Sequence, residues 1–265
     1  MPSLSKHCFF FWRGTQSEGR PFDRLRANGC VLSVQTLKLA TYCDGDLELT
    51  GHLARPAGEP RAAVAVFPTI HNVTPTVAAK AEALADAGYL AMVMDFYGEE
   101  VTQDNPGPPL AATLRADTDT YRTRLRAGLA ALRDIAPDLP MAAIGFCMGG
   151  QAVLELARDG ANLAAVASFH GLLDTQRPAE PGAVKARILT CHGDADPLVP
   201  REQVLAFWEE MDRAGADWHF HSYSGVKHGF TNPDSPHGNE VVAYDASADR
   251  QSWAAMLGLF DEVLA

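Results

Sequence analysis

The stretch "AAIGFCMGGQAVLELA" (Ala142–Ala157) joins an apolar run to a helical pattern through a short turn rich in glycine. Gly145, Cys147 and Gly149 in this turn have the spacing G-x-nucleophile-x-G of a nucleophile elbow, in which a strained turn lifts a side chain above the end of a strand. The positive end of the following helix favours thiolate over thiol. Cys147 is therefore the predicted nucleophile, and the alternative is a buried structural cysteine in a tight turn.

The flanking sequence alternates apolar strand patterns with amphipathic helix patterns, which predicts a parallel sheet covered by helices on both faces. Strands are expected over 62–68, 89–98, 141–146, 163–171, 186–193 and 217–225, and a leading antiparallel hairpin over 37–42 and 47–54. Helices are expected over 77–88, 113–135, 149–160, 201–215 and 245–264. A proline-rich loop, Asp104–Thr113, is expected near the mouth of the site.

Composition excludes several classes of protein. The chain has 265 residues, 47% of them hydrophobic, and no apolar run reaches the length of a membrane span. Its net charge of -11 disfavours nucleic-acid binding. The odd number of scattered cysteines suggests neither a zinc ribbon nor a disulfide scaffold, so a cytoplasmic location is expected. These cysteines are Cys8, Cys30, Cys43, Cys147 and Cys191.

The domain organisation divides the chain unequally. Residues 1–30 lack a regular apolar pattern and are expected to be a flexible or extraneous segment, with an added edge element as the alternative. Residues 31–265 contain neither an internal repeat nor a linker, and are expected to form one domain.

A nucleophile of this kind needs a base, and the base needs an acid that orients it. The stretch "HGDADPLVP" follows one predicted strand and offers two aspartates, of which Asp196 is the predicted acid and Asp194 the alternative. His228, in the loop after the last strand, is the predicted base. Because ligands bind at the carboxyl ends of parallel strands, these residues are expected to meet at one edge of the sheet.

Four further histidines have less specific settings. His219 and His221 lie on one face of a predicted strand, where a metal is conceivable, but a third ligand at suitable spacing is missing from the pattern. His170 and His192 each end an apolar strand and are expected either to line the site or to pack in the core. Neither a metal nor an organic cofactor is expected.

From about Leu37 to the C-terminus the chain resembles the dienelactone hydrolase family, whose members are cysteine-dependent α/β-hydrolases. The motifs that carry this resemblance are "GFCMGG", "HGDADPLVP", "YSGVKHGFTNP" and "ADRQSWAAMLGLF". The resemblance implies a three-layer α/β-hydrolase fold and a triad of Cys147, Asp196 and His228. It also implies an oxyanion hole built from the backbone N–H groups of Met148 and Ile70.

Three positions depart from the family pattern. The resemblance places Thr69 where the founding enzymes carry a glutamate that helps to deprotonate the cysteine, so activation is assigned to His228 and the helix dipole, or to a carboxylate such as Glu99. Glu99 and Asn232 stand where those enzymes hold the substrate carboxylate with arginines. A neutral ester or lactone is therefore the expected substrate. The other predicted pocket residues are His71, Phe96, Tyr97, Phe146 and Phe230.

Two other functions remain open from the sequence. Cys147 could belong to a redox-responsive protein, with Cys191 as the resolving thiol. The fold could also serve as a binding module with a vestigial triad. The expected partner is a small-molecule ester or lactone, without nucleic acid or membrane, and the pattern leaves open whether the chain is a monomer or a homodimer.

Overall fold

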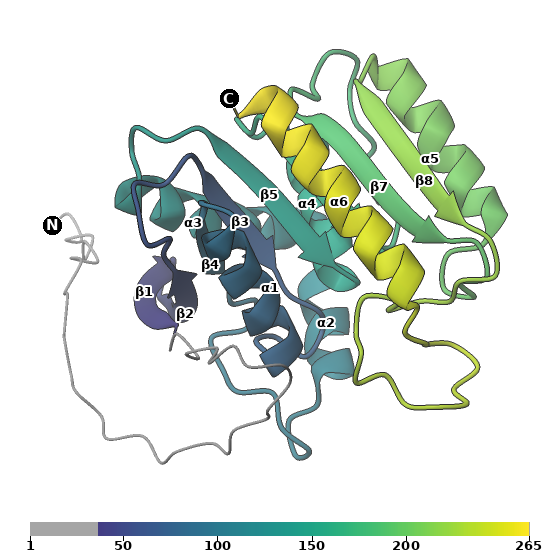
Figure 1. Cartoon of the computed structure of the whole chain (residues 1–265), viewed down its shortest axis with the longest axis horizontal. Coiled ribbons are helices and arrows are strands. Elements are labelled where there is room, and N and C mark those ends of the chain that lie inside the picture. Colours follow the sequence, from purple (N-terminus) through teal and green to yellow (C-terminus); the bar gives the residue numbers. More distant parts are fainter. Residues whose placement is uncertain (1–36, 265) are drawn as a thin grey trace, which may run out of the picture.

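The structure, a computed structural model, describes residues 37–264, so the predicted N-terminal segment 1–30 lies outside the described residues. Eight strands form one sheet in the order β1-β2-β4-β3-β5-β6-β7-β8 (Figure 1). The strands are β1 (Lys38–Asp44), β2 (Leu47–Ala54), β3 (Ala63–Phe67), β4 (Leu90–Val93), β5 (Met141–Phe146), β6 (Ala165–Phe169), β7 (Arg187–Gly193) and β8 (Trp218–Tyr223).

The hairpin of β1 and β2 turns at Gly45, whose φ of 60° suits glycine, and it pairs antiparallel with β4. All other neighbours pair in parallel. The chain runs from β3 outward to β4 and then returns to the other side of β3 with β5. The strand order therefore reverses between β3 and β5, and this is where sheets of this kind bind ligands.

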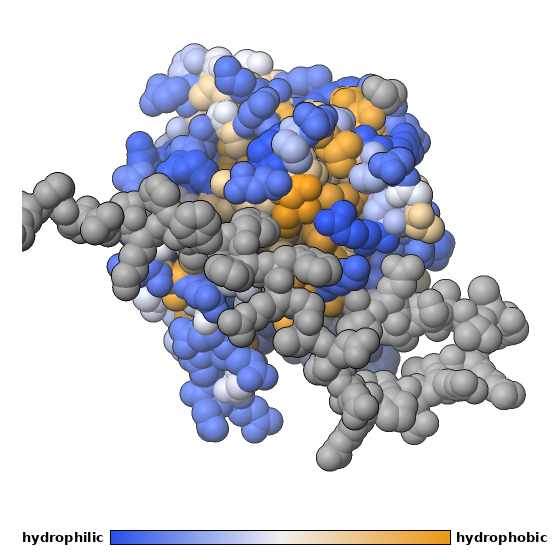
Figure 2. All heavy atoms as spheres, turned by 90° about the vertical axis from the view of Figure 1, so that its left-hand side faces the viewer, coloured by the Kyte–Doolittle hydropathy of each residue, from blue (hydrophilic) through white to orange (hydrophobic). Residues whose placement is uncertain are grey.

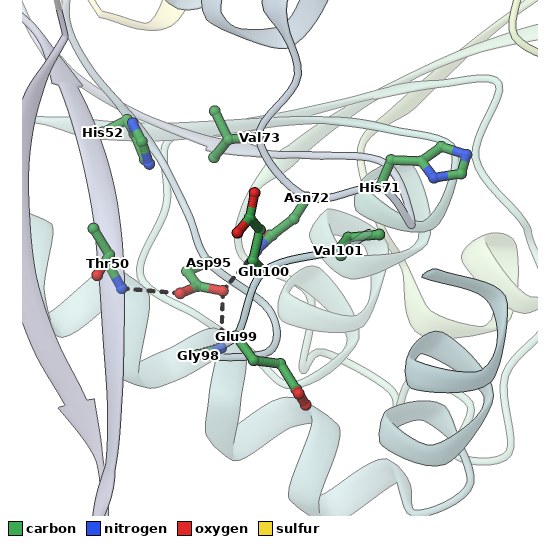
Figure 3. A pocket seen from close by; sticks show the side chains of 10 residues that line it. All are labelled: Thr50, His52, His71, Asn72, Val73, Asp95, Gly98, Glu99, Glu100 and Val101. Carbon is green, nitrogen blue, oxygen red and sulfur yellow. Dashed lines mark hydrogen bonds between the residues drawn. The ribbon is translucent and has the colours of Figure 1, made fainter. Parts of the chain in front are cut away.

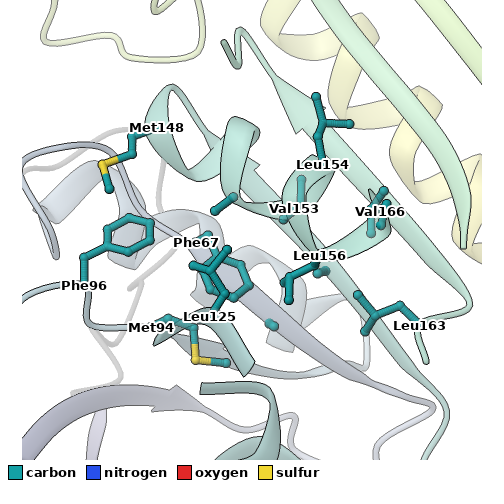
Figure 4. Close-up of a cluster of buried hydrophobic side chains, with 14 of the residues drawn as sticks. Phe67, Met94, Phe96, Leu125, Met148, Val153, Leu154, Leu156, Leu163 and Val166 are labelled. Atoms are coloured by element: carbon teal, nitrogen blue, oxygen red, sulfur yellow. The ribbon is translucent and has the colours of Figure 1, made fainter. Parts of the chain in front are cut away.

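Six helices cover both faces of the sheet: α1 (Pro75–Asp86), α2 (Gly107–Arg115), α3 (Thr118–Ile135), α4 (Met148–Arg158), α5 (Arg201–Ala214) and α6 (Ala246–Val263). α1 and α6 pack on one face, and α2 to α5 pack on the other, each with its own buried apolar cluster (Figure 1). Figure 4 shows part of the cluster under α2 to α5, which includes Phe67, Leu125 and Leu156. The expected three-layer fold with an antiparallel N-terminal edge is confirmed.

The prediction of one helix over 113–135 is wrong, and so is the prediction of a loop over Asp104–Thr113. α2 already begins at Gly107, because prolines are tolerated in the first helical turn, where their missing N–H groups have no partner to lose. Asp117 then interrupts the pattern and caps α3 by accepting the N–H of Thr120 at 2.9 Å.

The face at the β1 edge is mostly hydrophilic, with apolar residues showing between the polar ones (Figure 2). Leu39 on β1 is 68% exposed. Among residues 37–264, no helix combines the length and the apolar character that crossing a bilayer requires.

Candidate active site

Cys147 stands between β5 and α4 with φ 56° and ψ -115°, a backbone conformation that side chains rarely adopt. Such strain persists only where the surrounding structure enforces it. The Cys147 side chain is partly exposed, whereas Phe146 and Met148 on either side are buried. The turn therefore presents the thiol to solvent at the N-terminus of α4.

Glycines make this tight turn possible. A Cβ atom on Gly145 would lie 1.9 Å from the carbonyl oxygen of Gly149, and one on Gly149 would lie 2.0 Å from the carbonyl oxygen of Phe67. Both obstacles are backbone atoms, which cannot rotate away. α4 thus packs directly against the ends of β3 and β5, and this packing holds Cys147 in place.

His228 and Asp196 form a buried hydrogen-bonded pair beside this turn. Nδ1 of His228 lies 2.7 Å from Oδ2 of Asp196, and both residues are 4% exposed. The other oxygen of Asp196 accepts the N–H of Leu198 at 2.8 Å, which fixes the carboxylate. Asp194 instead pairs with Arg201 through both of its oxygens, at 2.9 and 2.6 Å, so it does not face His228.

The charge of His228 depends on its neighbours. Burial disfavours the imidazolium, but the hydrogen bond that the ring donates to Asp196 and the proximity of Cys147 outweigh burial and raise the pKa of His228 to about 10. Nε2 of His228 is buried and makes no hydrogen bond of normal geometry to another described residue. Cys147 raises the pKa of the ring first through the close approach of its sulfur as a hydrogen-bond partner and then through its charge. Nε2 is the ring nitrogen that Asp196 leaves free.

The N–H groups of Met148 and Ile70 belong to segments that converge on Cys147. Met148 is the first residue of α4, so its N–H has no acceptor within the helix. Ile70 follows β3, next to Thr69, in a turn closed by the bond from Asn72 N–H to the Thr69 carbonyl at 3.0 Å. Tyr97 links the two segments, because its hydroxyl donates to the Ile70 carbonyl at 3.1 Å and lies 3.6 Å from Sδ of Met148.

Asp95, which the sequence analysis did not identify, stabilises this turn through hydrogen bonds. Its Oδ1 accepts hydrogen bonds from the side chain of Asn72 at 2.7 Å and from the N–H of Gly98 at 3.0 Å, while Oδ2 accepts one from the N–H of Thr50 at 3.0 Å (Figure 3). Oδ1 also accepts the N–H of Tyr97 at 2.9 Å. One buried carboxylate therefore ties β2, the segment after β4 and the turn of Ile70 together. Its place directly after an apolar strand was the available signal.

The predicted pocket residues separate into two groups. Phe96, Phe146 and Phe230 are 0–2% exposed and lie inside the apolar clusters, so their rings support the site from the core and offer little open surface. Their position at the end of a strand did not by itself distinguish residues that line a pocket from residues that pack in the core. Asn232 is partly exposed, but its Oδ1 accepts bonds from Thr76 and from the N–H of Asp234, which occupies it in loop structure.

His71 and Glu99 are exposed and line a cavity of about 390 Å³ on the β2 side of the Ile70 turn (Figure 3). Its ten lining residues include three carboxylates, those of Asp95, Glu99 and Glu100, and neither lysine nor arginine. Cys147 and His228 are not among them. The surface next to the candidate site is therefore acidic.

His192, His219, His221 and Cys191, a second free thiol among residues 37–264, make no hydrogen bond to the side chains of Cys147, Asp196 or His228. His219 and His221 are exposed on β8, and within residues 37–264 no three His, Cys, Asp or Glu side chains gather to hold a metal ion. His192 is 2% exposed at the end of β7, beside Phe220. Cys191 is 1% exposed, and burial raises the pKa of its thiol to about 12.

Comparisons with known proteins agree with this architecture. The model of the dienelactone hydrolase family matches residues 49–264. The solved protein m3DLH is 35% identical, with a TM-score of 0.80, over 86% of this chain and 98% of its own. A dienelactone hydrolase-like promiscuous phosphotriesterase from metagenomic libraries is 34% identical, with a TM-score of 0.79 and the same coverage of both chains.

Among curated proteins, a probable 2-oxo-3-(5-oxofuran-2-ylidene)propanoate lactonase of Bradyrhizobium sp is 29% identical over 219 residues, which are 76% of this chain and 84% of the relative. The family model covers more than half of the chain, and the two solved relatives are aligned over nearly their whole length. With the elbow after β5 and the sheet order, these matches show that the chain belongs to the dienelactone hydrolase family and is a hydrolase.

Proposed function

We propose that this protein hydrolyses neutral carboxylic esters or lactones through a thioester on Cys147. The observation that carries the proposal is the convergence of three strand ends: the strained Cys147 after β5, Asp196 after β7 and His228 after β8. Residues of these types in this order form a nucleophile, an orienting acid and a base. Neither a metal nor an organic cofactor enters the steps below.

In acylation, Sγ of Cys147 attacks the carbonyl carbon, and the carbonyl oxygen becomes an oxyanion held by the N–H groups of Met148 and Ile70. Such a donor contributes about 3 kcal/mol to the stability of the transition state. The carbon–oxygen bond then breaks, and protonated His228 delivers the proton on Nε2 to the leaving alkoxide. Asp196 stabilises the imidazolium and fixes the orientation of the ring.

Deacylation uses the same histidine in the opposite sense. Thioester formation removes the negative charge of Cys147, which is one of the causes of the raised pKa of His228. The ring, neutral after it has given up its proton, can then take a proton from a water molecule as that water attacks the thioester. The carbon–sulfur bond breaks, the carboxylic acid leaves and the thiolate returns.

The charge around the site supports a neutral substrate. Glu99 and Glu100 line the cavity beside the Ile70 turn, and a substrate carboxylate there would meet like charges instead of a cation. The lactonase activity named for the Bradyrhizobium relative supports lactones within the proposed class. It does not identify the lactone that this chain would take.

The proposal is tested with a panel of p-nitrophenyl esters and neutral lactones measured beside cis- and trans-dienelactone. We expect kcat/KM for the best neutral compound to exceed that for either dienelactone by about a hundredfold. Comparable rates for a dienelactone would refute the neutral-substrate claim. An absence of turnover across the panel would refute the hydrolytic claim itself.

The redox alternative is weakened by the second thiol. A resolving cysteine needs thiolate character and access, and Cys191 has neither, because it is 1% exposed and its pKa is raised. Peroxide treatment followed by mass spectrometry would reveal a Cys147–Cys191 disulfide if the redox function were correct. We expect no such bond.

The raised pKa of His228 predicts the alkaline limb of the pH profile. Below a pH of about 10 the His228 ring of the resting protein is protonated and can donate a proton to the leaving alkoxide. Above this pH the ring loses that proton and can no longer donate it. We therefore expect kcat/KM for an ethyl ester to fall about tenfold per pH unit above pH 10. A p-nitrophenyl ester, whose leaving group departs without a proton, is the matched control and is expected to show a much weaker decline. Equal limbs for both substrates would contradict this role of His228.

The link between Asn72 and Asp95 predicts an effect on the oxyanion hole. Asn72 has φ 58°, so Asn72→Gly keeps the backbone conformation and removes only the side-chain bonds to Asp95 and to Phe96 N–H. We expect kcat to fall about tenfold while KM changes less than about twofold, because the Ile70 N–H would be held less firmly. Steady-state kinetics check this split, and a change confined to KM would contradict it.

A further inference from the structure

His170 follows β6 and has no part in the mechanism above, although it lies beside two of its residues. Its side chain is 2% exposed and its φ is 42°, a left-handed backbone conformation that is uncommon for residues other than glycine. Its own N–H donates to the carbonyl of Cys191 at 2.8 Å. A strained, buried and titratable residue at this edge of the sheet requires a physical reason.

Close packing of two glycines brings His170 to the elbow. A Cβ atom on Gly150 would lie 2.6 Å from Cα of Gly171, and one on Gly171 would lie 2.6 Å from the carbonyl carbon of Gly150. The first turn of α4 and the segment after β6 therefore touch backbone to backbone. His170, next to Gly171, is held against the elbow as a result.

The imidazole contacts the elbow itself. Nδ1 of His170 lies 3.1 Å from the backbone nitrogen of Cys147, whose N–H also points to the carbonyl of Phe169 at 3.1 Å. Because this N–H can only donate, Nδ1 must be the unprotonated acceptor. The proton of the neutral ring is then on Nε2, which lies 2.9 Å from Oγ1 of Thr231.

The same ring also contacts the segment that carries the base. The His170 and His228 rings lie 5.2 Å apart, edge to face at 67°, and Thr231 follows His228 by three residues. Burial, reinforced by the charge of His228, lowers the pKa of His170 well below its ordinary value. His170 therefore stays neutral beside an imidazolium and keeps its acceptor for Cys147.

We propose that His170 is a positioning residue that holds the backbone of Cys147 through Nδ1 and so sets the thiol against His228. This inference rests on the proposed function, since it concerns the same nucleophile. It assigns His170 no contact with the substrate. The N–H of Cys147 selects the tautomer and is the group that the ring positions, while Thr231 accepts the proton on Nε2.

Two amide variants separate these contacts. In His170→Asn the amide oxygen can replace Nδ1 as the acceptor for Cys147, whereas in His170→Gln the longer side chain reaches the place of Nε2 and leaves the Cys147 N–H without this acceptor. The readouts are the pH profile of iodoacetamide alkylation at Cys147, located by peptide mass spectrometry, and kcat and KM for a p-nitrophenyl ester. Thermal unfolding checks that both variants are folded.

We expect His170→Asn to keep kcat within about threefold of wild type and to keep the alkylation profile. We expect His170→Gln to lower kcat about tenfold at nearly unchanged KM, and to change the alkylation profile, with a rate about tenfold lower at pH 7. Identical alkylation profiles for the two variants would overturn the proposal. Because alkylation requires no turnover, an inactive wild-type protein would refute the proposed function and leave the test of His170 intact.

Discussion

Cys147→Ala is expected to lower kcat/KM for the best ester by about 10⁴-fold, because the proposed covalent route has no substitute nucleophile. The fold should tolerate the change, since the side chain is partly exposed. Steady-state kinetics measure the loss, and Cys191→Ser, a change at the buried thiol, serves as the control and should retain turnover. Activity that survives in Cys147→Ala would contradict the assignment.

The same position allows a test of the backbone strain. Cys147→Gly should be equally inactive but more stable than Cys147→Ala by about 1 kcal/mol, because glycine adopts a φ of 56° without penalty. Urea unfolding of the two variants measures the difference. If the backbone of Cys147 were unstrained, as in an ordinary structural cysteine, the glycine variant would be no more stable than the alanine variant.

Gly149→Ala is expected to destabilise the fold by about 3 kcal/mol or more. The added Cβ would lie 2.0 Å from the Phe67 carbonyl oxygen and 2.4 Å from that of Pro68. Neither backbone atom can move without displacing β3 or the segment that leads to Ile70. A fall of about 10 °C in the unfolding temperature is expected.

Gly258→Ala is the matched control for this prediction. Gly258 lies in α6, and a Cβ atom there would meet nothing within 4 Å. Alanine favours helix over glycine by up to about 1 kcal/mol, so this variant should be slightly more stable than wild type. If both alanine variants unfold at the wild-type temperature, the close packing of α4 against β3 does not hold the elbow.

Local sequence patterns predicted most of the architecture, because parallel strands and their helices have clear apolar periods. These patterns gave wrong helix boundaries where proline or a capping side chain, and not the spacing of apolar residues, decided where a helix begins. The prolines after Gly107 looked like a loop but stand in the first turn of α2, and Asp117 divides a continuous amphipathic pattern into two helices. The turn "GFCMG" was readable because its glycines stand at fixed spacing.

The candidate site was predictable only for residues whose role follows from chain order. Asp196 was preferred over Asp194 from its loop position, and the structure pairs Asp196 with His228. Asp95 was missed because its partners come from distant segments, including Thr50. The same holds for the bond between His170 and Cys147, which joins the ends of two strands. Long-range hydrogen bonds of this kind leave no period in the sequence.

The central claim is tested most directly by acid quenching the protein during turnover of p-nitrophenyl pivalate, whose bulky acyl group leaves slowly, and locating the acyl group by peptide mass spectrometry. The account predicts a pivaloyl group on the peptide that contains Cys147, released by neutral hydroxylamine as a thioester should be. Release of p-nitrophenol with the acyl group on another residue, or at an unchanged rate in Cys147→Ala, would contradict it.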